Sequence, residues 1–137
     1  MKTETRLQVL NKLSRKCGYC GDELNGVFQI DHVIPRVDFD YVVTNRKHWI
    51  PESLKHLKTG DVNHIDNLMP SCWACNNRKS SMHLDLFRSE LQEQLSRANE
   101  NSANYRMAKK YGQVVETPSL IVFYFESYPA HALQIEK

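Results

Sequence analysis

The chain has 137 residues, which is enough for one compact domain and little more. A formal net charge of +2 is compatible with a nucleic-acid partner but does not argue for one, so any basic surface must come from local clustering. The hydrophobic content of 41% and the charged content of 25% are ordinary for a globular protein, and no low-complexity tract interrupts the chain. We therefore expect a single folded domain over residues 1–137.

Neither the start of the chain nor any apolar run suggests a signal peptide or a membrane-spanning segment. Residues 1–6 are polar and lack an apolar core of signal-peptide length. The longest apolar run, Leu120–Phe125, is too short to cross a bilayer. We expect a cytoplasmic protein with no membrane partner, in which cysteines are reduced and a disulfide framework is the weaker explanation.

In chain order, the first elements are a helix and a strand. Residues 3–16 carry Leu7, Leu10 and Leu13 at helical spacing, and Thr3 or Thr5 is a candidate cap. Residues 27–35 alternate apolar and polar side chains, which predicts a strand that ends near Pro35. Residues 36–64 have no clear period and look like an insertion of unknown role, with five basic side chains that are candidates to contact DNA: Arg36, Arg46, Lys47, Lys55 and Lys58.

The second half of the chain is predicted to be mostly helical. Residues 77–79 look like part of a short helix, and residues 81–137 form an extension with two more helices and one strand. The first of these helices carries an apolar stripe formed by Leu84, Phe87, Leu91 and Leu95. The second runs from Ser102 to Tyr111 and is ended by Gly112, and the strand is the apolar run at 120–125.

The four cysteines form two pairs, Cys17 with Cys20 and Cys72 with Cys75, each separated by two residues. Two such pairs make a tetrahedral four-sulfur site, which zinc prefers and which leaves no open position for a substrate. Gly18 and Gly21 supply the backbone freedom that a tight metal-binding turn needs. We therefore predict one structural Zn²⁺ per chain; redox dithiols or disulfides are the alternative reading.

Between and beside the cysteine pairs lie polar residues in a specific order. Asp31 and His32 are followed by Ile34-Pro35, Asn67 is followed by Leu68, and Asn76 directly follows the last cysteine, with Lys79 three positions later. On a strand Asp31 and His32 would point to opposite faces, but at a strand end both can approach one site. The other histidines lack such a context and are interpreted as ordinary polar residues: His48, His56, His64, His83 and His131. His64 stays of interest, because it lies close to Asn67 in the sequence.

This order of motifs, over residues 17–80, resembles the HNH endonucleases, also called ββα-metal or His-Me finger nucleases. It is similar to the zinc-bearing phage and bacterial forms, including the phage recombination endonuclease VII type, where Asn follows the last zinc cysteine. Many family members have His at the position of Asn76. The resemblance implies an α+β fold, in which the four-cysteine zinc holds together a ββα-metal core that is flanked by helices.

The resemblance also implies a mechanism. Asp31 and Asn76 would hold a catalytic Mg²⁺ or Mn²⁺ through oxygen atoms, and His32 would act as general base. Asn67 would support the base by hydrogen bonds across the loop between the strands, although an ordinary turn residue could look the same. Arg78 and Lys79 are candidates to contact DNA phosphates, with a solvated basic face as the alternative.

The leading hypothesis is therefore a metal-dependent endonuclease that hydrolyses phosphodiester bonds in duplex or branched DNA. The resemblance implies a bacterial or phage origin, and the protein could act as a monomer or a homodimer. The main alternative is a non-catalytic, zinc-stabilised nucleic-acid-binding module, which would not need Asp31 and His32. A structural zinc adaptor is a third possibility, and it would not need Asp31, His32 and Asn76 together.

Overall fold

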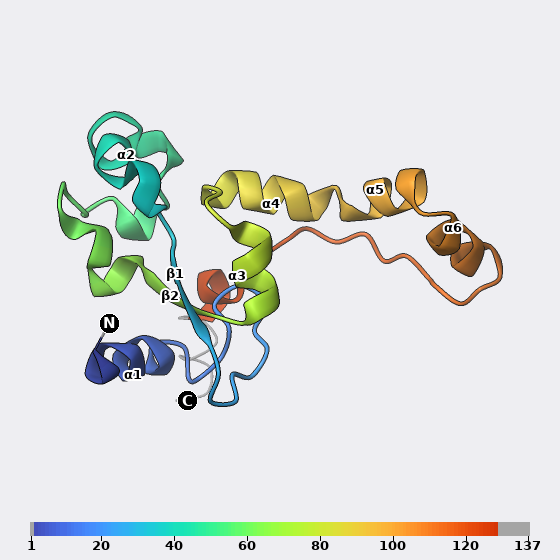
Figure 1. The fold of residues 1–137 in the computed structure, drawn as a ribbon. Coiled ribbons are helices and arrows are strands. Elements are labelled where there is room, and N and C mark those ends of the chain that lie inside the picture. Colours follow the sequence, from blue (N-terminus) through green and yellow to red (C-terminus); the bar gives the residue numbers. More distant parts are fainter. Residues whose placement is uncertain (1, 129–137) are drawn as a thin grey trace. The chain divides into compact units, whose positions relative to one another are not determined.

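A computed structural model describes residues 2–128. The helices and strands, in chain order, are α1 (Thr3–Asn11), β1 (Gln29–His32), α2 (Phe39–Asn45), β2 (Leu68–Ser71), α3 (Trp73–Lys79), α4 (Leu84–Gln92), α5 (Gln94–Asn101) and α6 (Ala103–Lys110) (Figure 1). The described residues group into two compact units. The first unit comprises residues 2–84 and 122–128, and the second unit comprises residues 85–121. The prediction of one domain over residues 1–137 stays a prediction.

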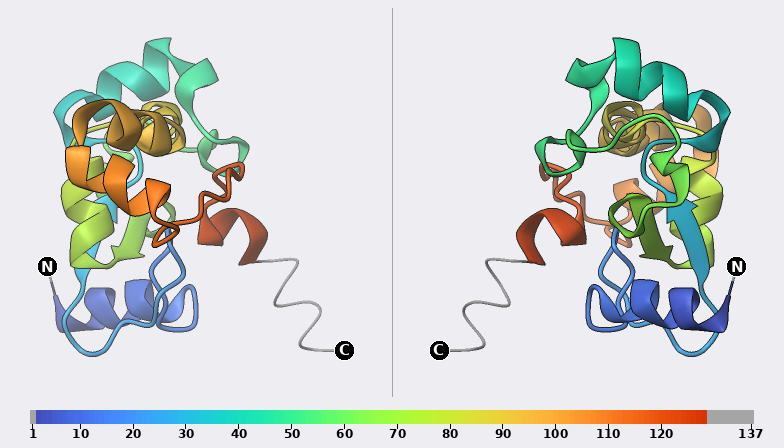
Figure 2. Two further views of the ribbon diagram at one scale, coloured as in Figure 1. Left: turned by 90° about the vertical axis from the view of Figure 1, so that its right-hand side faces the viewer. Right: turned by 90° about the vertical axis from the view of Figure 1, so that its left-hand side faces the viewer.

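The first unit is built on an antiparallel pair of strands followed by a helix. In this pair Asp31 lies opposite Met69 and His32 lies opposite Leu68. One residue separates β2 from α3, so the order is strand, strand, helix, as predicted. Figure 2 shows α1 at one end of the strand pair and residues 36–67 at the other. The fold is therefore α+β, with a ββα core.

The first helix is shorter than predicted. It ends at Asn11 rather than near residue 16, because Ser14 and Arg15 adopt positive φ angles of 55° and 64°, which no helix tolerates. Its N-cap is Lys2, whose side chain makes no capping hydrogen bond, rather than Thr3 or Thr5. The short helix still buries Leu10, and Leu13 is buried just beyond its end.

The aperiodic stretch after β1 folds into one short helix and single turns. Besides α2, residues 36–67 contain five 3₁₀ turns of three residues each: Arg36–Asp38, Lys47–Trp49, Glu52–Leu54, Asp61–Asn63 and Ile65–Asn67. A few apolar side chains hold this segment together, including Phe39, Val42, Ile50, Leu54 and Leu57. The absence of a sequence period in this stretch thus reflects turns too short to show one.

The predicted strand at residues 120–125 is wrong. Leu120 and Val122 are 85% and 64% exposed, and residues 124–128 are helical. Of the predicted strand, Phe123 is buried, and its ring meets the Tyr19 ring edge-on with 5.4 Å between centroids. The amides of Tyr124 and Phe125 donate to the carbonyls of Tyr19 and Gly18. This segment is therefore bound to the turn between Cys17 and Cys20, which we call the first cysteine turn, and it does not pair with a strand.

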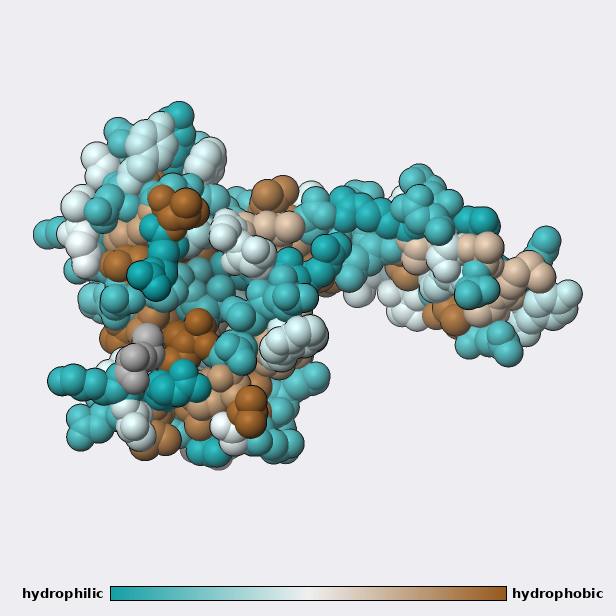
Figure 3. Space-filling model, in the orientation of Figure 1, coloured by the Kyte–Doolittle hydropathy of each residue, from teal (hydrophilic) through white to brown (hydrophobic). Residues whose placement is uncertain are grey.

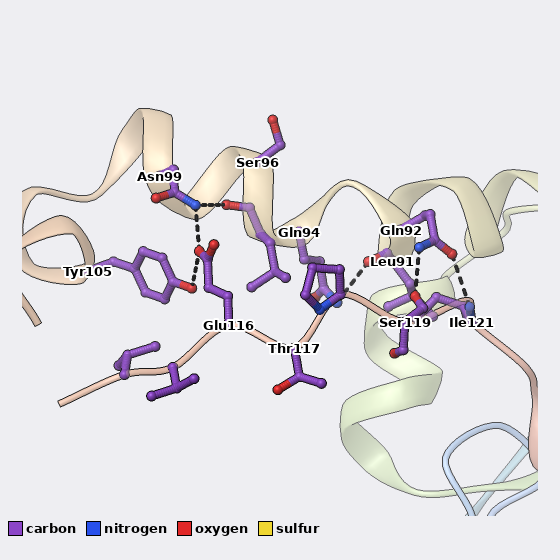
Figure 4. Close-up of a pocket in the computed structure, with 14 residues that line it drawn as sticks. Leu91, Gln92, Gln94, Ser96, Asn99, Tyr105, Glu116, Thr117, Ser119 and Ile121 are labelled. Atoms are coloured by element: carbon purple, nitrogen blue, oxygen red, sulfur yellow. Dashed lines mark hydrogen bonds between the residues drawn. The ribbon is translucent and has the colours of Figure 1, made fainter. Parts of the chain in front are cut away.

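The second unit consists of helices and an irregular segment that returns beside them. The predicted apolar stripe spans α4 and α5, which are separated at Glu93, and α6 is capped by the Ser102 hydroxyl. Gly112 follows α6 with a positive φ of 75°, as predicted for a helix end. Figure 4 shows Glu116 of the returning segment accepting hydrogen bonds from Asn99 and Tyr105.

Candidate functional site: a four-cysteine centre beside an Asp-His cleft

The four cysteine side chains converge in the first unit. Their sulfur atoms all lie within 4.8 Å of one another, and the Sγ atoms of Cys20 and Cys72 are 3.8 Å apart. Zn–S bonds of about 2.3 Å in a tetrahedron place neighbouring sulfur atoms about 3.8 Å apart. The cluster therefore fits a zinc ion in both chemistry and spacing.

The electrostatics of the cluster show how closely these thiols interact. A hydrogen bond from Cys75 lowers the pKa of Cys17 to about 4, and the same hydrogen bond raises the pKa of Cys75. Burial raises the pKa of Cys20 to about 12. The thiols thus interact closely, and a divalent cation would take the place of their protons.

Two glycines allow the first cysteine turn to form, for different reasons. Gly21 has a positive φ of 81°, which supports the predicted need for backbone freedom. Gly18 does not have a positive φ; instead, a Cβ atom there would lie 2.1 Å from the Met69 sulfur. The Gly18 amide donates to the carbonyl of Pro70 at 2.7 Å, so the close approach fastens this turn to β2.

Asp31 lies at the centre of a cluster of buried polar side chains. Its side chain is 7% exposed, and its Oδ2 atom lies 2.9 Å from the Lys79 ammonium. The Tyr19 hydroxyl donates a hydrogen bond to the same Oδ2 atom, and burial raises the pKa of that hydroxyl. Among the residues that the structure describes, the Oδ1 atom of Asp31 has no hydrogen-bond partner. One carboxylate oxygen is therefore held in place, and the other remains available.

Lys79 does not occupy the position expected of a phosphate contact. Its side chain is fully buried, and its ammonium donates to the His32 carbonyl at 3.0 Å as well as pairing with Asp31. An ammonium group so enclosed holds α3 against β1 and cannot lie on a DNA phosphate at the surface. Arg78, the other predicted phosphate contact, is exposed.

His32, the last residue of β1, is half-buried. Its Nε2 atom lies 2.8 Å from the side-chain oxygen of Asn63. An amide oxygen can only accept, so Nε2 carries a proton, and in the neutral ring the lone pair is left on Nδ1. Asn63 therefore selects the tautomer of His32.

Asn67 is fully buried and joins the ends of the two strands. Its side chain accepts from the Ile34 amide at 2.8 Å and donates to the carbonyls of Ile34 and Val62. Its own carbonyl accepts from the Val33 amide at 3.0 Å. These bonds fix the backbone that directly follows His32.

Asn76 lies within α3, one helical turn before Lys79 and therefore on the same side of that helix. The N-cap of α3 is Cys72, whose sulfur accepts from the Cys75 amide, so Asn76 is not the cap residue. Among the described residues its side-chain amide has no hydrogen-bond partner, and the side chain is half-buried. A free amide oxygen is thus available on the helix that packs against Asp31.

A cleft of about 470 Å³ opens at the end of β1. Asp31 and His32 both line it, so the strand end brings the two neighbouring residues to one site. The other lining residues come from β1, from the turn after it and from the end of α3: Ile30, Pro35, Arg36, Val37, Ser80 and Ser81. Asn76 and Asn67 are not among them.

Comparison with known families decides the assignment of this core. The family model described as HNH endonuclease matches residues 17–82. Residues 17–82 therefore form an HNH endonuclease domain. No curated protein and no solved structure matches the chain. The family assignment thus rests on the motif region, which contains both cysteine pairs and Asp31, His32, Asn67 and Asn76.

The HNH region also contains functional candidates that the sequence did not reveal. In the sequence Tyr19 is only one of two residues between a pair of cysteines, and Asn63 belongs to the aperiodic stretch. Both are functional candidates because of their hydrogen bonds: Tyr19 contacts Asp31, and Asn63 contacts His32. The partners are 12 and 31 positions apart, so no local pattern could have indicated them.

Two further observations concern the helices and the surface of the molecule. No helix among residues 2–128 combines the length and the apolar composition that crossing a membrane requires. On the face drawn in Figure 3, hydrophilic residues predominate and hydrophobic ones gather in small separate groups.

Proposed function

We propose that this protein is a metal-dependent endonuclease that hydrolyses phosphodiester bonds in DNA. The observation that carries the proposal is that Asp31 and His32 line one cleft, with the Asp31 carboxylate held by Lys79 and the His32 ring held by Asn63. A hydrolytic site needs such fixed groups, because rate depends on holding a base and a charged ligand in position before the substrate arrives.

His32 is the proposed general base. With the Nε2 proton donated to Asn63, the lone pair on Nδ1 is free to accept a proton from an attacking water molecule. An imidazole suits this task near neutral pH, since its ordinary pKa is about 6.5. Asn67 is a positioning residue, because it fixes the backbone at Val33 and Ile34 directly after the base.

Asp31 and Asn76 are the proposed ligands of a divalent ion. The Oδ1 atom of Asp31 and the amide oxygen of Asn76 are hard donors without partners among the described residues, and they suit Mg²⁺ or Mn²⁺. When bound, such an ion neutralises charge on the scissile phosphate and on the leaving oxygen. Lys79 and Tyr19 keep the carboxylate oriented by holding its Oδ2 atom.

DNA is the proposed partner, either duplex or branched. Arg36 lines the cleft and is the proposed contact to a phosphate near the base, while Arg78, exposed on α3, is a second candidate phosphate contact. The four-cysteine centre is proposed to hold one structural zinc ion per chain. We further propose a bacterial or phage protein that acts in the cytoplasm, as a monomer or a homodimer.

The metal requirement provides the test. Zinc-loaded protein should cleave duplex or branched oligonucleotides only with added Mg²⁺ or Mn²⁺, and Asn76→Ala should need a higher ion concentration to reach the same rate. Asn77→Ala, on the exposed side of the same helix, is the matched control and should behave like the parent. Equal ion dependence in Asn76→Ala and the parent would remove Asn76 from the proposed site. Binding without cleavage under all these conditions would favour the non-catalytic binding module.

A further inference from the structure

A second group of potential metal ligands lies within the HNH region, away from the cysteines. It comprises His56, His64 and Asp66, and we call it the His-Asp cluster. His56 follows the turn Glu52–Leu54, while His64 and Asp66 lie at the turn Ile65–Asn67, directly before β2. From the sequence alone both histidines are ordinary polar residues, because they lack the motif context that surrounds His32.

The geometry of the His-Asp cluster suits a small cation. The Oδ2 atom of Asp66 lies 2.8 Å from Nε2 of His56 and 3.8 Å from Nδ1 of His64. One ligand atom from each residue lies within 4.8 Å of the other two. A tetrahedral zinc ion with ligand bonds of about 2.0–2.1 Å holds its ligand atoms about 3.4 Å apart, so small side-chain shifts suffice.

The hydrogen bonds within the cluster show which protons an ion would replace. The Asp66 amide donates to Nδ1 of His64 at 3.0 Å, so Nδ1 carries no proton, and a metal ion bound there would displace this amide hydrogen bond. Nε2 of His56 donates to the Asp66 carboxylate, and a cation between them would take the place of this proton. Two imidazole nitrogens and one carboxylate oxygen form a ligand set typical of zinc and similar first-row ions.

The charge and exposure of the cluster also permit an ion. The side chains of His56 and Asp66 are 51% and 45% exposed, so an ion can enter from solvent. Lys12 lies nearby, but its ammonium donates to the carbonyls of Ile65 and Leu68. Among the described residues, Lys12 and Asp66 form no direct ion pair, although their charges attract each other at longer range, so His56 is the side chain that an ion would displace from the carboxylate.

We propose that the His-Asp cluster is a second metal-binding site, for Zn²⁺ or a similar first-row cation. It would fasten the turn-rich segment after α2, which has no strand and no further α-helix, to the start of β2. Such a cross-link stabilises a segment with few apolar side chains of its own. Three protein ligands leave a fourth position for water. The site does not depend on the proposed nuclease activity.

Metal stoichiometry tests this proposal. The full chain, loaded with zinc at the cysteines and freed of excess metal, is titrated with Zn²⁺ in a calorimeter. We expect one further equivalent per chain. His56→Ala and Asp66→Asn should each weaken this second binding by at least about tenfold, since even loss of an outer-shell partner costs about 10–100-fold in affinity. The zinc retained by the cysteines should be unchanged in both variants.

Two controls separate the His-Asp cluster from other sites. His48→Ala removes an exposed histidine of the same segment, and Asn76→Ala alters the proposed catalytic ligands; both should take up the second equivalent like the parent. Absence of a second equivalent in the parent would overturn the proposal. A second equivalent lost in Asn76→Ala but kept in His56→Ala would also overturn it, because the ion would then belong to the cleft.

Discussion

At the scale of single residues, the polar groups around Asp31 show how a buried charge is accommodated. A carboxylate with little solvent is costly unless it is paired and hydrogen-bonded, and here Lys79 and Tyr19 supply both. The Lys79 ammonium also satisfies the His32 carbonyl. Lys79 thus has a structural role in this chain, and its ion pair links α3 to β1 next to the proposed base.

Removing the buried cation should destabilise the protein. Lys79→Met keeps the length of the side chain but leaves the Asp31 carboxylate without its counter-charge, so the free energy of unfolding should fall by about 3–5 kcal/mol. Urea denaturation of zinc-loaded protein measures this change. Arg78→Met, at the exposed neighbour, should stay within about 0.5 kcal/mol of the parent. Equal stabilities of the two variants would contradict the importance of the ion pair.

The hydrogen bond from His32 to Asn63 should matter for rate and not for folding. Asn63 is exposed, so Asn63→Ala should keep the melting temperature and zinc content of the parent. It should lower kcat by about 10- to 100-fold, because a misplaced base loses much of its effect, while KM changes little. Asn63→Asp retains an acceptor oxygen and should keep most activity. An Asn63→Ala variant with parental kcat would show that His32 needs no such partner.

At the scale of elements, the resemblance predicted the ββα core correctly, and the sequence placed α6 to within one residue at each end. The motifs made this possible, because cysteine pairs and the Asp-His step mark the strands and α3 directly. The prediction of a strand at 120–125 is wrong, because an apolar run does not show which part of the chain it will pack against. The amides of Tyr124 and Phe125 bond to the first cysteine turn instead of a neighbouring strand. Contacts such as that of Lys79 with Asp31 join distant positions, and no local pattern reveals them.

The cysteine centre should control the folding of the HNH region. Cys72→Ser removes one of the four proposed zinc ligands, and metal binding is part of the folding free energy of such a core. We expect loss of bound zinc and of the near-ultraviolet circular dichroism of the buried Tyr19. Chelation of the parent should give the same result, and added zinc should reverse it. A zinc-free variant with an unchanged melting temperature would exclude a structural metal.

In the second unit, Glu116 holds the returning segment to the helices. Hydrogen bonds from Tyr105, Asn99 and Lys109 lower the pKa of Glu116 to about 2. Because this pKa is lower in the folded state, the stabilisation is present above the ordinary glutamate pKa and is lost as the pH falls towards about 2. Glu116→Ala should therefore speed amide exchange in residues 113–117 at neutral pH. Unchanged exchange there would show that Glu116 is not the anchor.

At the scale of the whole molecule, the chain combines an HNH core with a helical second unit and a net charge near zero. With so little overall charge, the proposed binding of DNA would rely on local basic groups such as Arg36 and Arg78. The core supplies the proposed chemistry within residues 17–82, while the choice of a DNA target would depend on side chains that reach the grooves. Cleavage and target choice are therefore separate questions for this protein.

Plasmid cleavage is the measurement that tests the central claim most directly. Zinc-loaded protein is incubated with supercoiled plasmid in Mg²⁺ or Mn²⁺, alongside an EDTA control and the variant His32→Ala. We predict nicked or linear plasmid with the parent alone, and folded, zinc-bearing His32→Ala protein that leaves the plasmid intact. Cleavage by His32→Ala at the parental rate would contradict the assignment of the general base, and cleavage that persists in EDTA would contradict the metal-dependent mechanism.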